Sequence, residues 1–289
     1  MKRIIHIVFL SGLSIFFLLG CMRIALRMSP TLFPHFTEAL FEECDLELAK
    51  DAIPANLKLL EGLLKNDPEN KKILTTLSMG FSGYSMLFLE GEEPERASHF
   101  YLRGMKYGLK ALGPKGEALG RLESKKGELE KRLQQIGGDD YEAFFWTTVS
   151  LSAWINLNLD KPAALTQLRL SQAYLKRILE IDGKYLYGFP YILTGVTLAA
   201  RPPMLGGNVE QAALAFQKAL TLSGGKFLLV QYYYARYYAP RVQDKKLFLR
   251  LIEDINAANP GALPEVCLIN TMIQHRAKEL KGMTDELFF

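Results

Sequence analysis

The sequence is poor in the residues from which most recognisable sites are built. Its 289 residues include three cysteines, four histidines and two tryptophans. Three cysteines are too few for a disulfide-dense scaffold, and none has the spacing of a zinc ligand set. A charge excess is lacking too, because 35 Lys+Arg against 31 Asp+Glu leave a net charge of +4. Nucleic-acid binding needs a concentrated basic face, so we expect no nucleic-acid partner.

Candidates for catalysis are equally scarce. The histidines at 35, 99 and 275 form no HExxH motif and no neighbouring pair. Residues 80–84 lack the last glycine of a nucleophile elbow, and residues 220–227 lack the first glycine and the Ser/Thr of a phosphate-binding loop. Asp139-Asp140 suits a helix cap better than an acid/base pair. We therefore predict that the protein is not an enzyme and that it needs no metal or cofactor.

The N-terminus has the layout of a lipoprotein signal peptide. Lys2 and Arg3 precede an apolar run over residues 4–19, and the run ends in the lipobox Leu18-Leu19-Gly20-Cys21. We predict a signal peptide over residues 1–20, lipid modification of the palmitate type on Cys21, and a tether over residues 21–35. The alternative is a plain membrane anchor, although the run falls short of the ~20 residues that span a bilayer. A lipidated chain would lie in a bacterial cell envelope.

The rest of the chain lacks alternating strand patterns and is predicted to be all-α. Apolar residues recur three and four positions apart, as in Leu57, Leu60, Leu63 and Leu64. Glycine, proline and asparagine breakers fall at helix-length intervals, for example at Gly113-Pro114. We assign residues 36–289 to a single helical domain.

Internal repetition is present but irregular. A shift of 115 residues superimposes Gly80 on Gly195 and Ala97 on Ala212. A small, bulky, small pattern with spacings of four and three recurs in four places: Ala97-Tyr101-Gly104, Ala164-Leu168-Ser171, Ala212-Phe216-Ala219 and, more weakly, Ala55-Leu59-Gly62. These spacings put the three residues on one helix face, where the small ones let a neighbouring helix approach closely.

The pattern resembles the second helix of a tetratricopeptide repeat. Gly80 and Gly195 lie 17 residues ahead of the alanines, so the first helix or the following loop must be longer than in the standard unit. We predict an α-α superhelix of about four divergent tetratricopeptide-like helix pairs. The alternative is an ordinary helical bundle that yields such triplets by chance.

Cys44 and Cys267 are the two cysteines of the predicted domain. They could pair across the two ends of the chain in an oxidising compartment. We expect them instead to be small buried apolar residues, which is how free cysteines usually behave.

Tyrosine is concentrated in one stretch of the chain. Eight of the 13 tyrosines lie between residues 185 and 245: Tyr185, Tyr187, Tyr191, Tyr232, Tyr233, Tyr234, Tyr237 and Tyr238. A tyrosine has an apolar ring and a polar tip, which suits a cavity for an amphipathic molecule or a protein contact. Helix packing with the hydroxyls in water is the alternative. By spacing, Tyr233 shares a helix face with Tyr237, and Tyr234 shares one with Tyr238.

The same stretch resembles the T-component lipoproteins of TRAP transporters, the tripartite ATP-independent periplasmic systems. The matching residues are Tyr187-Gly188-Phe189-Pro190, Gly195, Ala200-Arg201-Pro202, Met204-Leu205-Gly206-Gly207, Ala212, Phe216, Ala219-Leu220, Ser223-Gly224-Gly225-Lys226-Phe227, Tyr234-Ala235, Tyr237-Tyr238-Ala239 and Gln243-Asp244. Asn208 stands where the family favours an acidic residue, and both residue types cap helices.

The resemblance implies a lipid-anchored homotrimer facing the periplasm. Met22, which follows Cys21, is not the aspartate that retains many lipoproteins at the inner membrane, so we expect the outer membrane rather than the inner one. The resemblance also implies association with a TRAP-type periplasmic solute-binding protein and delivery of a hydrophobic ligand. The candidate ligand or partner residues are Tyr191, Arg201, Tyr233, Tyr234, Tyr237 and Tyr238. The candidate structural residues are Gly195, Gly206, Gly207, Ala212, Phe216, Ala219, Gln243 and Asp244.

Two questions stay open at this point. Arg201 precedes two prolines, so its guanidinium should be held at the loop edge, where it could bind a carboxylate or a partner, or form a structural pair with Asp244. The function could also differ, because tetratricopeptide folds commonly bind peptides. The alternative is a scaffold lipoprotein for outer-membrane or cell-wall assembly.

Overall fold

The computed structural model describes residues 32–120 and 127–289, and the predicted signal peptide and Cys21 lie outside these ranges. The prediction of an all-α fold is confirmed, because no strand occurs in the described residues. The helices are α2 (Leu32–Phe41), α3 (Leu46–Leu64), α4 (Lys71–Tyr84), η1 (Ser85–Leu89), α5 (Pro94–Ala111), α6 (Pro114–Gly120), α7 (Glu128–Gln134), η2 (Gly138–Asp140), α8 (Tyr141–Leu157), α9 (Pro162–Leu165), α10 (Leu168–Asp182), α11 (Tyr185–Ala200), η3 (Pro203–Leu205), α12 (Val209–Ser223), α13 (Leu229–Tyr233), η4 (Tyr234–Tyr238), α14 (Lys245–Ala257), η5 (Pro260–Ala262), η6 (Pro264–Val266), α15 (Cys267–Gly282) and α16 (Thr284–Leu287).

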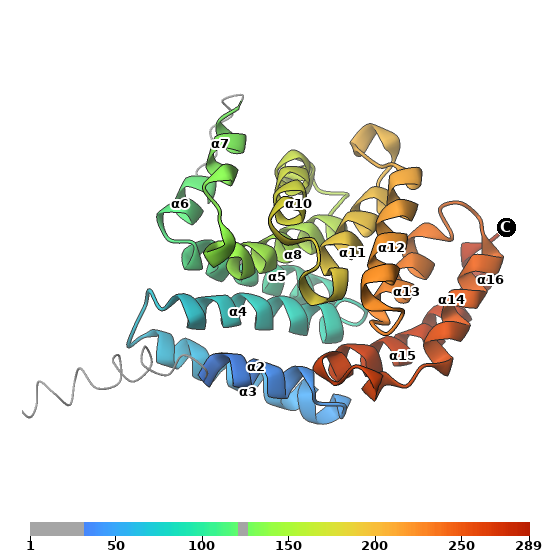
Figure 1. Ribbon diagram of the computed structural model, residues 1–289, viewed down its shortest axis with the longest axis horizontal. Coiled ribbons are helices and arrows are strands. Elements are labelled where there is room, and N and C mark those ends of the chain that lie inside the picture. The colour runs from blue at the N-terminus through green and yellow to red at the C-terminus, as the bar shows by residue number, and fades with distance from the viewer. Residues whose placement is uncertain (1–31, 121–126) are drawn as a thin grey trace, which may run out of the picture.

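Successive helices pack as pairs, consistent with a tetratricopeptide-like array (Figure 1). The pairs are α4/α5, α8/α10, α11/α12 and α13/α14, and α3 packs on α4 ahead of them. The long spacing ahead of Ala97 arises because the π-helix η1 extends α4 by more than a turn. The long spacing ahead of Ala212 arises from the loop that carries η3. The pair α13/α14 lacks the small, bulky, small pattern, so the sequence pattern does not predict it.

Three of the four predicted triplets lie in helix contacts, and one does not. Ala97, Tyr101, Ala212 and Phe216 are fully buried. The triplet that begins at Ala164 is buried but broken, because its alanine lies in α9 and the other two residues lie in α10. The prediction of a fourth triplet at Ala55-Leu59-Gly62 was wrong, because Leu59 is 58% exposed. On α3 the buried residues are Leu57 and Leu60 instead. Among the described residues, no helix covers the outer face of α3.

Small residues set the distance between α4, α5 and α8. A Cβ added to Gly108 on α5 would lie 2.1 Å from the Thr147 hydroxyl on α8, and one added to Gly104 would lie 2.8 Å from the hydroxyls of Ser82 and Ser150. These two serine hydroxyls hydrogen-bond each other at 2.6 Å. The helices therefore approach closely over a seam of glycine, serine and threonine, with the buried hydroxyls mostly paired.

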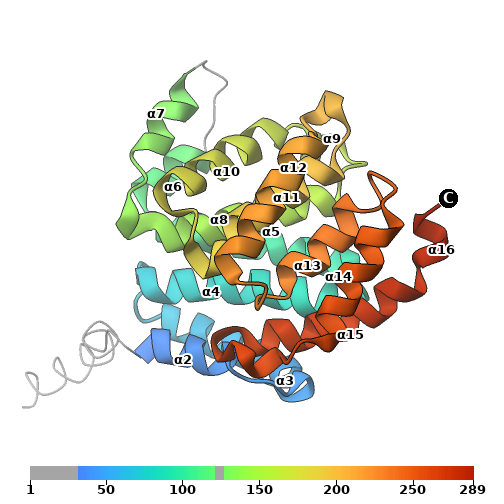
Figure 2. The ribbon, with the colours of Figure 1, turned by 45° about the vertical axis from the view of Figure 1, so that its right-hand side comes forward.

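The helix α15 connects the end of the array to its beginning (Figure 2). It packs against α2 and α3 as well as against α13 and α14. Cys267 at its first position forms a disulfide with Cys44, with a Cα–Cα distance of 5.2 Å. The Arg276 guanidinium donates a hydrogen bond of 3.0 Å to the Leu87 carbonyl in η1.

The expectation of two unpaired buried cysteines was therefore wrong. Cys267 is buried as expected, but Cys44 is exposed in the turn between α2 and α3. Sequence reasoning could not place these two cysteines side by side, because 223 positions separate them. Only the return of α15 to the N-terminal helices brings them together.

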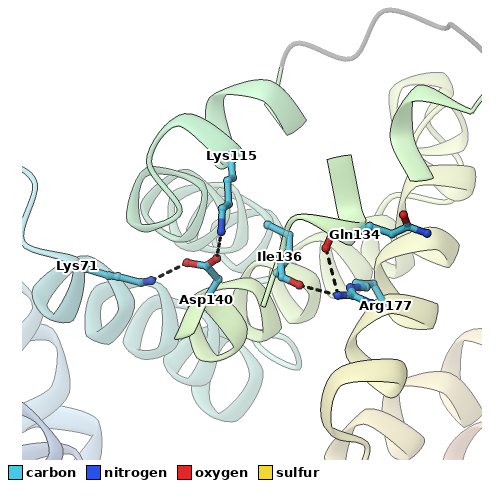
Figure 3. Close-up of polar contacts among 6 residues, drawn as sticks. All are labelled: Lys71, Lys115, Gln134, Ile136, Asp140 and Arg177. Carbon is cyan, nitrogen blue, oxygen red and sulfur yellow. Dashed lines mark hydrogen bonds and ion pairs between the residues drawn. The ribbon is translucent and has the colours of Figure 1, made fainter. Parts of the chain in front are cut away.

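Asp140 links three parts of the array rather than capping a helix. It occupies the N-cap position of α8, yet its side chain makes no cap hydrogen bond. Figure 3 shows its carboxylate between Lys71 of α4, at 2.7 Å, and Lys115 of α6, at 2.6 Å. Nearby, Arg177 of α10 donates a hydrogen bond of 2.7 Å to the carbonyl of Ile136. The loop before α8 is thus held from both sides.

We predict that the disulfide stabilises the closed array by about 2–4 kcal/mol, because it restricts a long loop of the unfolded chain. Reduction should lower the urea midpoint of the mature protein. The variant Cys44→Ala/Cys267→Ala should show the lower midpoint with and without reductant. Two free thiols at these positions in the unreduced protein, measured by mass spectrometry after alkylation, would contradict the pairing.

We predict that Asp140→Asn lowers stability at neutral pH by about 1 kcal/mol, the range of two partly exposed ion pairs. Burial raises the pKa of this carboxyl, but hydrogen bonds from Lys115 and Lys71 outweigh burial and leave the pKa below its ordinary value. A lowered folded-state pKa gives stability above the unfolded pKa of about 3.9, and that stability is lost as the pH falls through the folded value.

Urea unfolding should therefore show a gap in unfolding free energy between wild type and Asp140→Asn at pH 7, and the gap should narrow as the pH falls below the ordinary aspartate pKa of about 3.9. The matched control is Asp139→Asn, because Asp139 is exposed and adjacent. An equal effect of both variants at pH 7 would exclude a specific role for the lysine pairs.

Candidate ligand-binding cavities

A small cavity lies beside α8, between the segment η1/α5 on one side and α11, α13 and η4 on the other. Its volume is about 60 Å³. It is lined by Glu90, which follows η1, and by residues of η1, α5, α8, α11, α13 and η4: Met86, Tyr101, Val149, Ser152, Ala153, Asn156, Leu157, Phe189, Leu193, Val196, Thr197, Tyr233 and Tyr237. We call it the central cavity. It brings together two of the six predicted ligand or partner residues, Tyr233 and Tyr237.

Two π-helical segments border the central cavity. In η1 the amide of Glu90 donates to the Ser85 carbonyl at 3.0 Å, and in η4 the amide of Ala239 donates to the Tyr234 carbonyl at 3.1 Å. Each bond spans five residues and so widens the helix by one residue, a rare arrangement that often occurs at functional sites. The extra residue sets the positions of Glu90 after η1 and of Tyr237 within η4. Both side chains line the cavity.

A carboxyl group surrounded by tyrosines dominates the electrostatics of the central cavity. The Tyr101 hydroxyl donates a hydrogen bond to Glu90. Burial raises the pKa of Glu90, while the bond from Tyr101 and the charges of Arg276 and Arg236 partly oppose the rise. Burial also raises the pKa of Tyr237 to about 12, so its hydroxyl keeps its proton at neutral pH.

Two polar atoms of the lining residues have no hydrogen-bond partner among the described residues. They are Asn156 Oδ1 on α8 and Thr197 Oγ1 on α11. Thr197 is 2% exposed, so bulk water does not reach its hydroxyl freely. Buried polar atoms are nearly always paired, which makes these two candidates for contact with a ligand or bound water.

A second, larger cavity lies on the other side of α5 and α8. Its volume is about 420 Å³. It is lined by Leu102, Met105, Leu109, Leu119, Gly120, Thr147, Leu151, Trp154, Ala163, Thr166, Gln167, Leu170 and Tyr174. We call it the apolar cavity, since aliphatic and aromatic side chains supply most of its wall. Such walls suit a hydrophobic molecule.

The remaining predicted tyrosines lie elsewhere. Tyr234 stacks on Phe216 of α12, with ring centroids 4.8 Å apart, and Tyr238 packs on Tyr234 at 5.0 Å. The ring of Tyr191 lies against Gly183, at the turn between α10 and α11. As the spacing predicts, Tyr233 and Tyr237 form a separate pair at 5.7 Å. The tyrosine-rich segment therefore divides between the central cavity and helix packing.

The prediction that the Arg201 guanidinium lies at the loop edge was wrong, because the side chain lies inside the protein. It is 1% exposed, and its three guanidinium nitrogens have no hydrogen-bond partner among the described residues. Burial lowers the pKa of the guanidinium to about 10. The alternative, a structural pair with Asp244, is not formed either. The Asp244 carboxylate caps α14 by accepting from the Leu247 amide at 2.9 Å. The two prolines hold the Arg201 backbone extended, but they do not fix the direction of its side chain.

Most of the predicted structural residues lie where neighbouring atoms leave no room for a larger side chain, or where the backbone has a positive φ. A Cβ on Gly195 would lie 2.8 Å from the Phe216 ring, and one on Gly207 would lie 1.8 Å from the Arg201 carbonyl. Gly206 has φ +86°, which favours glycine. Ala212 and Ala219 are fully buried beside Phe216 on α12. These residues pack α11 on α12 and close the loop between them.

Gln243 links the turn before α14 to the C-terminus. Its backbone has φ +56°, an uncommon value for a residue other than glycine. Its side-chain amide donates to the Leu287 carbonyl at 3.2 Å, and its side-chain oxygen accepts from the Phe289 amide at 3.2 Å.

Glu90, Asn156 and Thr197 were missed by sequence reasoning. None belongs to a motif, and helical periodicity treats each as an ordinary polar position. A signal did exist for Glu90, which is the first charged residue after the apolar run of η1. Within the described residues, no group of three or more His, Cys, Asp or Glu side chains could hold a metal ion. No helix in that part of the chain is both long and apolar enough to cross a membrane.

Comparison with known proteins gives a relative and a family. The chain is 22% identical over 269 residues to an uncharacterised protein of Treponema pallidum (strain Nichols), covering 88% of this chain and 83% of the relative. Residues 42–288 match the model of the TRAP transporter T-component, a range that includes all of the described helices except α2. A match of that extent covers the predicted motif region and the N-terminal helices alike. The chain belongs to the TRAP transporter T-component family.

Proposed function

We propose that this protein is a non-enzymatic, lipid-anchored accessory component of a TRAP transport system that binds a periplasmic solute-binding protein. The family match over residues 42–288 carries the proposal. The lipobox at Cys21 supplies the anchor, and the residue after it, Met22, is compatible with the outer membrane. The family resemblance adds a homotrimeric assembly.

The disulfide supports a location outside the cytoplasm. Disulfides form and persist in oxidising compartments such as the periplasm, whereas cytoplasmic thiols are kept reduced. Cys44 is exposed, so the bond to Cys267 would be open to cytoplasmic reductants. A periplasm-facing domain would keep the bond intact and so keep the array closed.

The loop between α11 and α12 supplies the docking point in this proposal. It carries Met204, whose side chain is 88% exposed in the middle of the family motif. The left-handed Gly206 and the tightly packed Gly207 fix the loop on the array. Leu214 of α12 is 65% exposed and adds a second apolar side chain to the following helix. Exposed apolar groups on a rigid support suit a protein contact.

The apolar cavity supplies the binding site for a hydrophobic ligand in this proposal. Its volume of about 420 Å³ lies within the usual range of small-molecule sites. Thr147, Thr166 and Gln167 are its polar lining groups, and none carries a charge. A charged solute would lose its hydration there without gaining a counter-ion, so an apolar molecule is favoured.

We predict that mild crosslinking in envelope extracts will recover a TRAP-type solute-binding protein with the wild-type chain. Met204→Asp should reduce the recovery several-fold, because a carboxylate at the contact must be desolvated. Met283→Asp is the matched control, since Met283 is 44% exposed on the far end of the chain. Recovery of envelope-assembly proteins alone would contradict the function. Equal recovery by both variants would contradict only the docking point.

We predict that a fluorescent, uncharged twelve-carbon fatty acyl ester will bind the mature domain and that Ala163→Trp will weaken its binding about ten-fold. Ala163 is exposed where it lines the apolar cavity, so an indole there should block the cavity without disturbing the core. Ala257→Trp on α14 is the control, because Ala257 is exposed and distant in sequence from the cavity lining. Unchanged fluorescence with Ala163→Trp would place the probe elsewhere.

A further inference from the structure

The polar groups of the central cavity include hydroxyl donors, one carboxyl group and a buried acceptor that is left unpaired. Glu90 provides two carboxylate oxygens, and the Tyr101 hydroxyl donates to one of them. Asn156 Oδ1 adds an acceptor that no described group satisfies. The Thr197 hydroxyl, which can donate or accept, is also unpartnered. Leaving buried acceptors unpaired costs free energy, so the cavity favours an occupant that brings donors.

The nearest positive charges are engaged elsewhere. Arg276 donates to the Leu87 carbonyl at 3.0 Å, and Arg236 donates to the Tyr232 hydroxyl at 2.9 Å. Neither arginine lines the cavity, although both charges act on Glu90 from outside it. An anionic group in the cavity would therefore face the Glu90 carboxylate with no cation beside it.

The rest of the wall is apolar and the space is small. Met86, Val149, Phe189 and Leu193 surround the polar groups. At about 10–15 Å³ for each water-sized group, a volume of about 60 Å³ holds about four to six non-hydrogen atoms. That is room for one polar head and a short stretch of hydrocarbon.

We propose that the central cavity is a binding site for the hydrogen-bond-donating head of a small amphipathic molecule, a hydroxyl or a protonated amine, and that it rejects carboxylates. Glu90 and Asn156 accept from the head, and Thr197 completes its coordination. The aromatic rings and aliphatic side chains cover the attached carbons. The site is separate from the apolar cavity, so this proposal does not rest on the proposed function.

Three four-carbon probes that differ only in their heads test the proposal: butan-1-ol, butylammonium and butyrate. Saturation-transfer NMR titrations of the disulfide-bonded mature domain should show binding of the alcohol or the amine, at least ten-fold tighter than binding of butyrate. Preference between alcohol and amine identifies the head. Equal binding of butyrate, or no binding of any probe because the cavity holds only water, would overturn the proposal.

Variants of the lining residues locate the binding. Glu90→Gln keeps the shape and a side-chain oxygen for Tyr101, and it should reduce the discrimination against butyrate at least five-fold. Thr197→Val removes the hydroxyl at nearly constant volume and should weaken the preferred probe about five-fold. Glu92→Gln is the matched control, since Glu92 is an exposed glutamate two positions further along the chain.

A second variant separates site loss from misfolding. Ala153→Leu places extra carbons in the cavity from a half-buried position on α8, and it should weaken all binding probes together. Thermal melting followed by circular dichroism shows whether each variant is folded. If folded Ala153→Leu and Glu90→Gln both bind like wild type, the probes bind outside the central cavity and the proposal is wrong.

Discussion

Closure of the helix array by α15 is the constraint on which the rest of the structure depends. A helical-repeat chain normally contacts only its sequence neighbours, so its two ends do not meet. Here the disulfide from Cys267 to Cys44 and the bond from Arg276 to the Leu87 carbonyl tie the last long helix to the first ones. Closure places η4 across from η1. The central cavity exists because these two segments, far apart in the chain, form facing walls.

The two ends of the array can meet because the helices between them pack closely together. Glycines on α5 and hydroxyl residues on α4 and α8 let three helices approach closely. Several buried hydroxyls there donate a hydrogen bond to a carbonyl of their own helix. Ser82 donates to the Ser78 carbonyl at 2.6 Å, and Thr147 donates to the Ala143 carbonyl at 2.7 Å. Such bonds satisfy the side chain without any partner helix. The Thr197 hydroxyl of α11, like that of Ser78 in the seam, has no hydrogen-bond partner among the described residues, but Thr197 also lines the central cavity.

Local patterns in the sequence predicted the helices and their close contacts, and they failed where distant segments meet. The periodicity of Leu57 and Leu60 and the triplet around Phe216 concern neighbours a few positions apart, so the chain itself records them. The disulfide, the direction of Arg201 and the role of Glu90 depend on which helices come together in space. The tyrosine cluster shows the limit within one segment. Its spacing predicted the pair of Tyr233 and Tyr237, but only the closed array decides that this pair faces a cavity.

The two cavities differ because neighbouring residues of the same helices face opposite sides. On α5, Tyr101 lines the central cavity and Leu102 lines the apolar one. On α8, Asn156 serves the first and Trp154 the second. The π-helical turns of η1 and η4 border only the polar side, where each adds one residue and moves a side chain inward. Irregular helices give up regular hydrogen bonding and persist where the position of a side chain matters. Their presence on one side alone indicates that the geometry of Glu90 and Tyr237 is under tighter constraint than the shape of the apolar cavity.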